Sequence, residues 1–279
     1  MVKRARLLLL GLAVALGSQA WADEARPRVV SLDYCADQYV LALADRDQIA
    51  AISSGPDDAW SHFRSRAEGL PLVRAAAEDV IALQPDLILR SYGGGPRALG
   101  FYERLGLEVH QIGYEPGLDA ARARVREIGA ALGQAARADV LIARMDATLL
   151  EAGAEASNLG ALYVTPGGVT AGAGVIVDDM LTAAGVRNLA AERGETGWPS
   201  LSLEALMLER PELVVTGFFN MPREQLDPWS ASRHPLMRRR LDELTTIQLD
   251  GALLSCSAWF IAEAALKVSE AARDLSGAP

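Results

Sequence analysis

The apolar positions of this chain fall into short runs that are separated by segments with helical spacing. The runs that predict buried strands lie at 28–32, 49–53, 87–89, 108–112, 161–165, 213–215 and 245–249. Between them, segments such as 36–44, 98–105 and 177–184 place apolar residues on one face of a helix. Strands that alternate with helices predict an α/β protein with mainly parallel sheets.

This alternation stops between 118 and 155, where the pattern is helical throughout. Gly129 and Gly133 interrupt the pattern, and a second helix is predicted over 135–152. The chain is therefore predicted to form an N-terminal lobe over 23–133, an interlobe helix over 134–156 and a C-terminal lobe over 157–279. Because a helix rather than a Gly/Ser-rich linker joins the lobes, we expect them to move little against each other.

One pattern occurs in both halves of the chain. Residues 78–89 and 204–215 each begin with a Glu, reach a Pro seven positions later and end in a short apolar run. Each copy predicts a short amphipathic helix that proline ends, followed by a buried strand. Two copies predict two similar lobes, and a cleft between lobes is a common place for a small ligand.

Residues 1–22 have the features of a secretory signal peptide. A basic start is followed by an uncharged apolar run over 7–17 and by Ala20-Trp21-Ala22, which predicts cleavage after Ala22. The apolar run is too short to span a bilayer, although an uncleaved anchor is the alternative. We predict an exported, soluble protein.

The charge of the exported chain is acidic. Removal of residues 1–22 takes away three of the 27 basic residues and leaves 24 against 36 acidic ones. The single basic run, Arg238-Arg239-Arg240, belongs to a predicted surface helix. An acidic protein without a basic stripe is a poor nucleic-acid binder, so we predict no nucleic-acid partner.

The exported chain contains two cysteines, Cys35 and Cys256. An even number of cysteines in an oxidising compartment favours a disulfide, which would join the first strand-to-helix turn to the last one. The alternative is two buried free thiols.

Aromatic residues concentrate in the loops that follow the predicted strands. Ligand sites in parallel sheets lie at the carboxyl ends of strands, and large rings offer wide apolar contact with a polar handle. Arg97 is a candidate partner for an anionic ligand, and Thr170 lies in the breaker-rich segment 165–174. The candidate ligand-binding residues are Tyr34, Trp60, Tyr92, Arg97, Thr170, Trp198, Phe218, Trp229 and Trp259.

The sequence does not favour a resident metal, a cofactor or catalysis. Its three histidines, His62, His110 and His234, are too few for a dedicated zinc or manganese site. Neither Gly-rich segment, 93–95 or 167–168, is followed by the Lys-Ser/Thr pair of a phosphate loop. No complete nucleophile and base set is present, so we predict a protein that is not an enzyme.

Three segments carry a resemblance to a known family. Arg28-Val-Val-Ser-Leu32, residues 77–89 and residues 197–206 are similar to signatures of the periplasmic substrate-binding proteins of ABC importers that carry iron–siderophore complexes and vitamin B12. These proteins are the class III, helical-backbone type. The resemblance implies two Rossmann-like α/β lobes joined by a single long α-helix.

The resemblance also implies roles for single residues. Glu78 and Glu204 match acidic residues that dock onto arginines of the membrane permease, one on each lobe. Trp198 matches a tryptophan that lies against the ligand in vitamin B12-binding members, and Trp60 and Tyr92 fall where those members place rings. The chain departs from the family pattern at 167–174, at 218–229 and at its two cysteines.

These observations predict a periplasmic, monomeric protein that delivers a bulky metal chelate to an ABC permease dimer. The chelate is a ferric siderophore, a corrinoid or haem, and Tyr34 and Tyr92 are the candidate axial ligands for haem. A binding protein for a bare metal ion and a secreted enzyme that uses the cleft are the alternatives.

Overall fold

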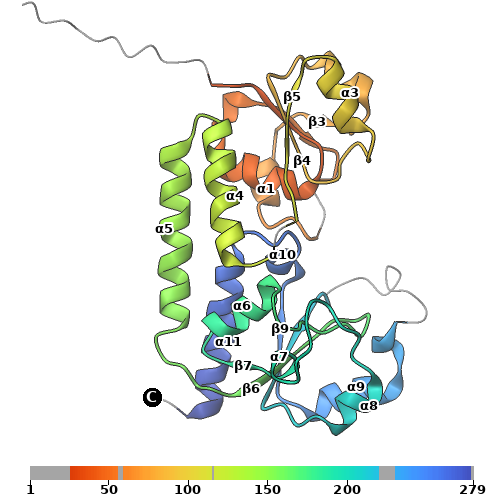
Figure 1. Cartoon of the computed structure of the whole chain (residues 1–279), viewed down its shortest axis with the longest axis vertical. Coiled ribbons are helices and arrows are strands. Elements are labelled where there is room, and N and C mark those ends of the chain that lie inside the picture. Colours follow the sequence, from red (N-terminus) through yellow and green to blue (C-terminus); the bar gives the residue numbers. More distant parts are fainter. Residues whose placement is uncertain (1–25, 56–58, 115, 220–229, 278–279) are drawn as a thin grey trace, which may run out of the picture.

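The chain folds into two α/β lobes, as the sequence predicted. The computed structural model describes residues 26–55, 59–114, 116–219 and 230–277. Each lobe contains one sheet in which all neighbouring strands are parallel. Helix α5 (Ala135–Ala152) runs along the side of both lobes (Figure 1). The predicted signal peptide and its cleavage point lie outside the described residues.

The N-terminal lobe contains a five-stranded sheet with the order β3-β2-β1-β4-β5. Its elements are β1 (Val29–Ser31), α1 (Tyr34–Leu43), β2 (Ile49–Ser53), β3 (Leu72–Val73), α2 (Ala77–Ala82), β4 (Leu87–Arg90), α3 (Ala98–Arg104) and β5 (Glu108–Gln111). Two 3-10 helices, η1 (Arg46–Gln48) and η2 (Arg64–Ala67), flank β2. The two central strands pair in register, Val29 with Leu87 and Ser31 with Leu89.

The C-terminal lobe contains a four-stranded sheet with the order β7-β6-β8-β9. Its elements are β6 (Gly160–Val164), α6 (Ile176–Ala183), β7 (Arg187–Asn188), α7 (Leu189–Glu192), α8 (Leu203–Leu208), β8 (Leu213–Gly217), η4 (Ala231–Arg233), α9 (Pro235–Glu243), β9 (Thr246–Leu249), α10 (Gly251–Leu254) and α11 (Ile261–Ser276). Strands β3 and β7 were not predicted, because two residues at a sheet edge are too few to show a hydrophobic period.

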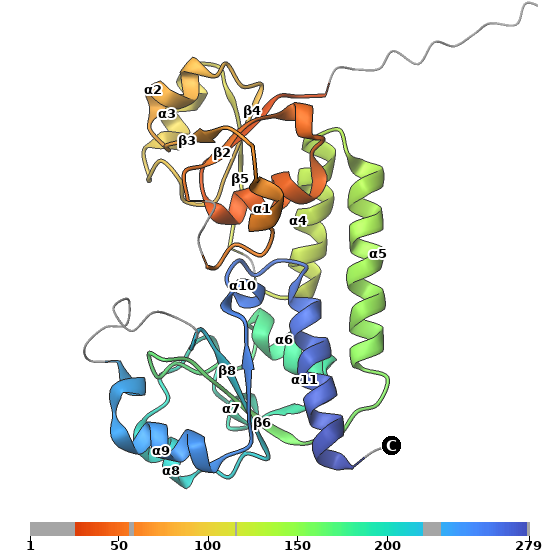
Figure 2. The same ribbon diagram turned by 180° about the vertical axis from the view of Figure 1, so that it is seen from behind.

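Helices on one side of the molecule connect the lobes. Helix α4 (Leu118–Ala131) turns at Gly133, whose φ of 66° suits glycine, and α5 returns beside it. A Cβ on Gly129 would lie 2.4 Å from the Cβ of Ala138, so only glycine permits this close approach. Helix α11 packs along α5 from the C-terminal lobe (Figure 2).

One apolar core continues from lobe to lobe. It contains Val29 and Leu87 of the first sheet, Tyr163 and Val215 of the second, and the facing sides of α4, α5 and α11. Protein interiors are close-packed and are not fluid, so this shared core holds the two lobes in one arrangement. Every helix in the described residues is too short or too polar to cross a bilayer.

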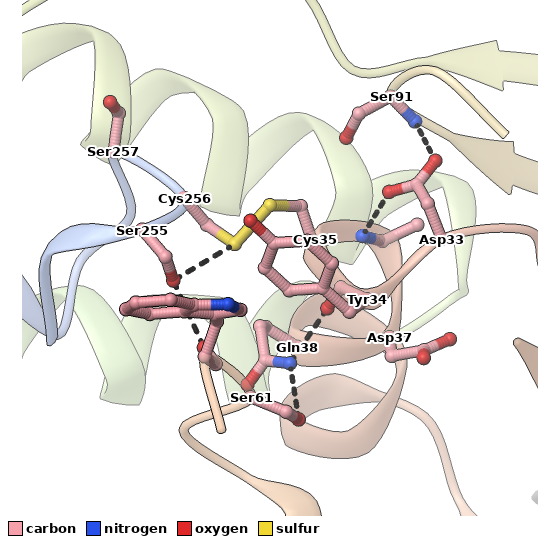
Figure 3. The surroundings of a disulfide bond; sticks show 12 residues. Asp33, Tyr34, Cys35, Asp37, Gln38, Ser61, Ser91, Ser255, Cys256 and Ser257 are labelled. Atoms are coloured by element: carbon pink, nitrogen blue, oxygen red, sulfur yellow. Dashed lines mark hydrogen bonds between the residues drawn. A yellow bond between two sulfur atoms is a disulfide. The ribbon is translucent and has the colours of Figure 1, made fainter. Parts of the chain in front are cut away.

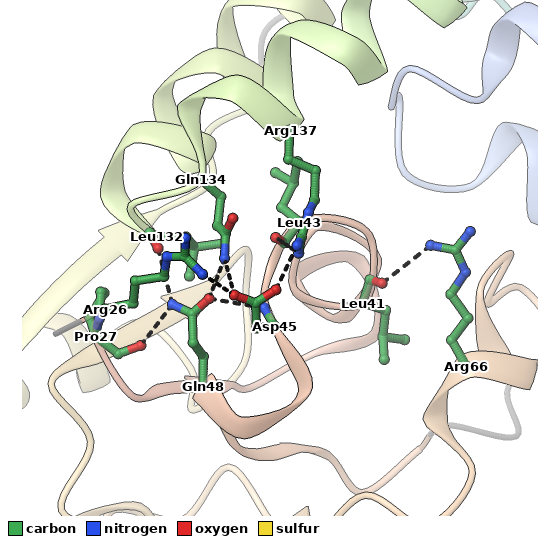
Figure 4. A network of polar contacts seen from close by, with 10 residues as sticks. All are labelled: Arg26, Pro27, Leu41, Leu43, Asp45, Gln48, Arg66, Leu132, Gln134 and Arg137. Carbon is green, nitrogen blue, oxygen red and sulfur yellow. Dashed lines mark hydrogen bonds and ion pairs between the residues drawn. The ribbon is translucent and has the colours of Figure 1, made fainter. Parts of the chain in front are cut away.

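A polar network fixes the end of α5 onto the N-terminal lobe (Figure 4). The carboxylate of Asp45 accepts hydrogen bonds from Arg26, from Gln134 Nε2 at 2.9 Å and from Arg137 Nη2 at 2.5 Å. The hydrogen bonds from Arg137 and Gln134 hold the pKa of Asp45 below its usual value, against the effect of desolvation. Asp45 therefore stays charged at this junction at neutral pH.

Candidate ligand-binding site

The best candidate for a ligand site lies where the strand order of the first sheet reverses. From β1 the chain adds β2 and β3 on one side of the sheet, and then it adds β4 and β5 on the other side. The strand order therefore reverses between β1 and β4, and this position is the topological switch point. Open parallel sheets bind ligands outside the carboxyl ends of strands at this point. A cavity of about 430 Å³ occupies this position.

The cavity receives side chains from both lobes. It is lined by Tyr34, Cys35, Ser91, Tyr92, Gln111, Ile112, Gly113, Tyr114, Arg124, Ser255, Cys256 and Ser257. The tyrosines follow β1, β4 and β5, and the 255–257 segment of the C-terminal lobe follows α10. Three phenol rings and a loop from the opposite lobe therefore surround one space.

Asp33 holds two parts of the cavity wall together. Its Oδ1 accepts the backbone N–H of Ala36 at 3.0 Å and so caps α1, the helix that begins at Tyr34. Its Oδ2 accepts the backbone N–H groups of Ser91, Tyr92 and Gly93 at 2.7, 3.0 and 3.0 Å. One buried carboxylate thus fixes the loop that carries Tyr92 against the helix that carries Tyr34.

We expect Asp33→Asn to loosen this wall. The amide of asparagine places N–H groups where the carboxylate accepted backbone N–H groups, and a buried donor without an acceptor costs about 1–3 kcal/mol. The predicted result is a protein that is less stable by about that amount in urea unfolding and that binds its ligand more weakly. Asp47→Asn, an exposed change outside the cavity, is the matched control. Equal affinity in Asp33→Asn and wild type would contradict this prediction.

A disulfide between Cys35 and Cys256 crosses from α1 to the C-terminal lobe (Figure 3). Its neighbours make two further links between the lobes. Ser255 Oγ donates to the backbone oxygen of Trp60 at 3.0 Å, and Arg124 Nη1 donates to the backbone oxygen of Ser257 at 3.2 Å. Three consecutive lining residues, 255–257, are therefore each attached to a different part of the N-terminal lobe.

Tyr114 of the cavity lining also makes a hydrogen bond to the opposite lobe. Trp198 Nε1 donates to the hydroxyl of Tyr114 at 3.1 Å, and the two residues belong to opposite lobes. The Trp198 ring also makes an edge contact with Tyr163, with ring centroids 6.3 Å apart. Tyr163 is buried, and burial raises the pKa of its phenol, so it supports Trp198 as a neutral ring.

The cavity lining is mostly neutral. Arg124, on α4, is its one charged side chain, and the lining contains neither histidine nor carboxylate. In the described part of the chain, no group of His, Cys, Asp and Glu is placed to hold a metal ion. The arrangement suits a ligand that offers apolar surface and oxygen acceptors to aromatic and hydroxyl groups.

The other predicted ligand residues lie in different surroundings. Trp60 and Phe218 pack against each other across the lobe interface, with ring centroids 5.0 Å apart. Arg97 is exposed at the start of α3. Thr170 is buried, and its hydroxyl has no hydrogen-bond partner among the described residues. Trp229 lies outside the described residues.

The structure places Trp259 away from the cavity lining. This residue is 4% exposed and lies in the core, where its ring contacts Tyr39 at a centroid distance of 4.9 Å. The position beside the loop after α10 suggested a ligand contact, but the chain turns inward there to begin α11. Trp259 therefore joins the lobes and has no surface for a ligand.

Sequence reasoning missed several lining residues: Gln111, Tyr114, Arg124, Ser255 and Ser257. Tyr114 could have been found, because it follows a predicted strand as Tyr92 does. Arg124 gave no signal, because a basic residue within a helix is most often solvated and only the packing of α4 turns it toward the cavity.

The paired glutamates occupy matching positions. Glu78 is the second residue of α2 and Glu204 the second residue of α8, and both are exposed. An acid in the first turn is favourable near the positive end of the helix dipole. Neither residue lines the cavity.

The fold has two lobes, and the candidate ligand site lies between them. Residues 29–218 match the family described as periplasmic binding protein. The chain belongs to the periplasmic binding protein family, and it is a binding protein rather than an enzyme. A comparison with curated protein sequences gave no match.

Solved structures share the fold. The apo form of the periplasmic heme-binding protein RhuT from Roseiflexus sp. RS-1 is 23% identical, with 90% of this chain and 99% of that chain covered and a TM-score of 0.67. The periplasmic heme-binding protein HutB of Vibrio cholerae is 20% identical, with 87% and 97% covered and a TM-score of 0.69. The periplasmic vitamin B12-binding protein BtuF of Vibrio cholerae is 18% identical, with 90% and 98% covered and a TM-score of 0.64.

Proposed function

We propose that this protein binds a bulky metal chelate between its lobes and delivers it to an ABC permease dimer. The observation that carries the proposal is the cavity at the switch point, with Tyr34, Tyr92 and Tyr114 on one lobe and the 255–257 segment on the other. Flat rings with polar edges suit a large ligand that has apolar faces and a polar periphery. The similar structures of heme-binding and vitamin B12-binding proteins support the same class of cargo.

Haem is the narrower candidate that one observation favours. A phenolate oxygen is one of the axial ligands that proteins supply to haem iron, and three phenols border this cavity. Arg124 in the lining would favour a carboxylate-bearing ligand of this kind. A ferric siderophore or a corrinoid remains within the broader proposal.

The proposal includes export. Residues 1–22 act as the signal peptide, and the mature chain works as a monomer in the periplasm. Its lobes comprise residues 23–133 and 157–279 and are connected through 134–156. Glu78 and Glu204 face the permease, one from each lobe.

We expect purified periplasmic protein to bind hemin, cyanocobalamin or a ferric hydroxamate and to lose tryptophan fluorescence on binding. Trp198→Ala should weaken binding by about 1–3 kcal/mol, because it removes an exposed ring that contacts Tyr114 of the cavity lining. Phe101→Ala, an exposed ring on α3 away from the cavity, is the matched control and should bind normally.

The test uses the visible spectrum and mass of any co-purified chelate, followed by fluorescence titration. Failure of all three chelates to bind the wild-type protein would contradict the proposed function. Normal affinity in Trp198→Ala would place the cargo away from Trp198.

A further inference from the structure

The two helices that carry the paired glutamates have a second feature in common. Glu78 and Glu204 are the second residues of α2 and α8, and the fifth residue of each helix is a large apolar one. These residues are Ile81 in α2 and Met207 in α8, and their exposed fractions are 36% and 45%. Residues three positions apart are neighbours on a helix surface. Each lobe therefore presents an acid and an apolar side chain next to each other.

The buried sides of the two helices are matched as well. Val80 and Leu206, which directly precede the exposed apolar residues, are 0% and 1% exposed. Each belongs to an apolar cluster that also contains strand residues of its own lobe. Packing within the lobes thus accounts for Val80 and Leu206, and it leaves Ile81 and Met207 to the solvent.

Both exposed pairs lie on the same side of the molecule. Helices α2 and α8 are at the ends of the lobes that lie away from α5 (Figure 2). Single exposed apolar residues are common on protein surfaces. Two such residues at matched positions, each beside an acid, suit a partner that presents the same surface twice. A two-fold symmetric dimer is a partner of this kind, because its symmetry axis repeats every surface patch.

We infer that Ile81 and Met207 are apolar contacts to the ABC permease dimer, one for each half of the dimer. This inference rests on the proposed function, in which Glu78 and Glu204 face the permease. Each apolar side chain enters a group of apolar permease residues beside the basic residue that pairs with the glutamate. The contact excludes water from the charge pair, as apolar neighbours do around the residues that dominate an interface.

The charges and the apolar contacts have different kinetic effects. Exposed charges at the rim of an interface mainly control the association rate and its dependence on salt. Most other interface contacts act on the dissociation rate. If the inference is correct, loss of Ile81 and Met207 shortens the lifetime of the complex with the permease without slowing its formation.

The first experiment identifies the partner of the two positions. A benzophenone amino acid replaces Ile81 or Met207 in the full chain, and ultraviolet light joins it to neighbouring C–H bonds in intact cells. Mass spectrometry of the products should find an ABC permease subunit at both positions. The same probe in place of Val140 or Leu150 is the matched control, because these apolar residues of α5 are also exposed.

The second experiment measures the complex with the permease so identified, purified in nanodiscs. Ile81→Gln and Met207→Gln replace an apolar side chain by a polar one that also suits a helix. We expect roughly three- to tenfold faster dissociation for each variant and about ten- to hundredfold for both together. The association rate and its salt dependence should stay at wild-type values, since both glutamates remain.

The control for these rates is Val140→Gln with Leu150→Gln, which makes the same chemical change on α5 and should dissociate as the wild type does. Urea unfolding of all variants shows that they fold. Fluorescence titration with hemin, cyanocobalamin and a ferric hydroxamate should give wild-type affinities, because neither Ile81 nor Met207 lines the cavity.

The inference and the proposed function fail differently. Equal crosslinking to the permease from all four positions, or wild-type dissociation in the double variant, would overturn the apolar contacts. If the wild-type protein binds none of the three chelates but crosslinks to the permease through Ile81 and Met207, the proposed cargo is wrong and the contacts stand.

Discussion

Reversal of both Glu78 and Glu204 to arginine is expected to abolish chelate uptake while the protein still folds and binds its cargo. The two side chains are exposed at the same position of α2 and α8, and neither lines the cavity. If each faces a permease arginine, the reversal places like charges against each other on both lobes, which costs several kcal/mol. Uptake should therefore fall to background in the double variant.

Each single reversal should reduce uptake by roughly tenfold, or about 1.4 kcal/mol, because the other lobe still engages. The control is Glu151→Arg with Glu270→Arg, which makes the same change in net charge at exposed positions of α5 and α11. Uptake of the co-purified chelate is measured in cells that depend on this protein, beside fluorescence titration of the purified variants. Normal uptake by the double variant would indicate that the two glutamates do not dock onto the permease and only stabilise the first turns of their helices.

Removal of the Cys35–Cys256 disulfide should produce the largest loss of stability. The two cysteines are 221 positions apart, and the chain-entropy account gives about 5 kcal/mol for a loop of that length. Measured losses on removal of native disulfides are about 2–5 kcal/mol, so we expect about 3–5 kcal/mol. The melting temperature should fall by roughly 10 °C.

Urea unfolding followed by tryptophan fluorescence measures this effect in Cys35→Ser, Cys256→Ser and the double variant. All three should lose similar stability, because each removes the same bond. Wild-type protein that is alkylated without reductant should remain unmodified at both cysteines. Labelling of both thiols in periplasmic material, or equal stability with and without reductant, would contradict the prediction.

The repeating pattern of the sequence predicted the fold because the five-residue strands β2, β6 and β8 are buried on both faces. Runs such as 49–53 and 213–215 can only be apolar if helices cover both sides of the sheet. The pairing of Cys35 with Cys256 followed from compartment and number alone. The edge strands β3 and β7 were not predicted, because two residues are too few to show a hydrophobic period.

The site was less predictable, because it depends on which loops the fold brings together. Tyr34 and Tyr92 were identified from their places after strands, and both line the cavity. Trp259 was identified by the same reasoning, but its ring is buried in the core. The hydrogen bond between Tyr114 and Trp198 joins residues 84 positions apart, and no local pattern signals such a contact.

The disulfide also determines how a pulling force would travel through this protein. A load applied at the two ends passes from β1 to Cys35, across the sulfur bridge to Cys256 and into α11. The strands from β2 to β9 lie within the covalent loop, so the covalent path of the load bypasses them. Since an extended chain spans about 3.3–3.6 Å per residue, the loop conceals on the order of 700–800 Å of contour length that only reduction releases. A machine that unravels the chain from one end would meet this barrier almost at once.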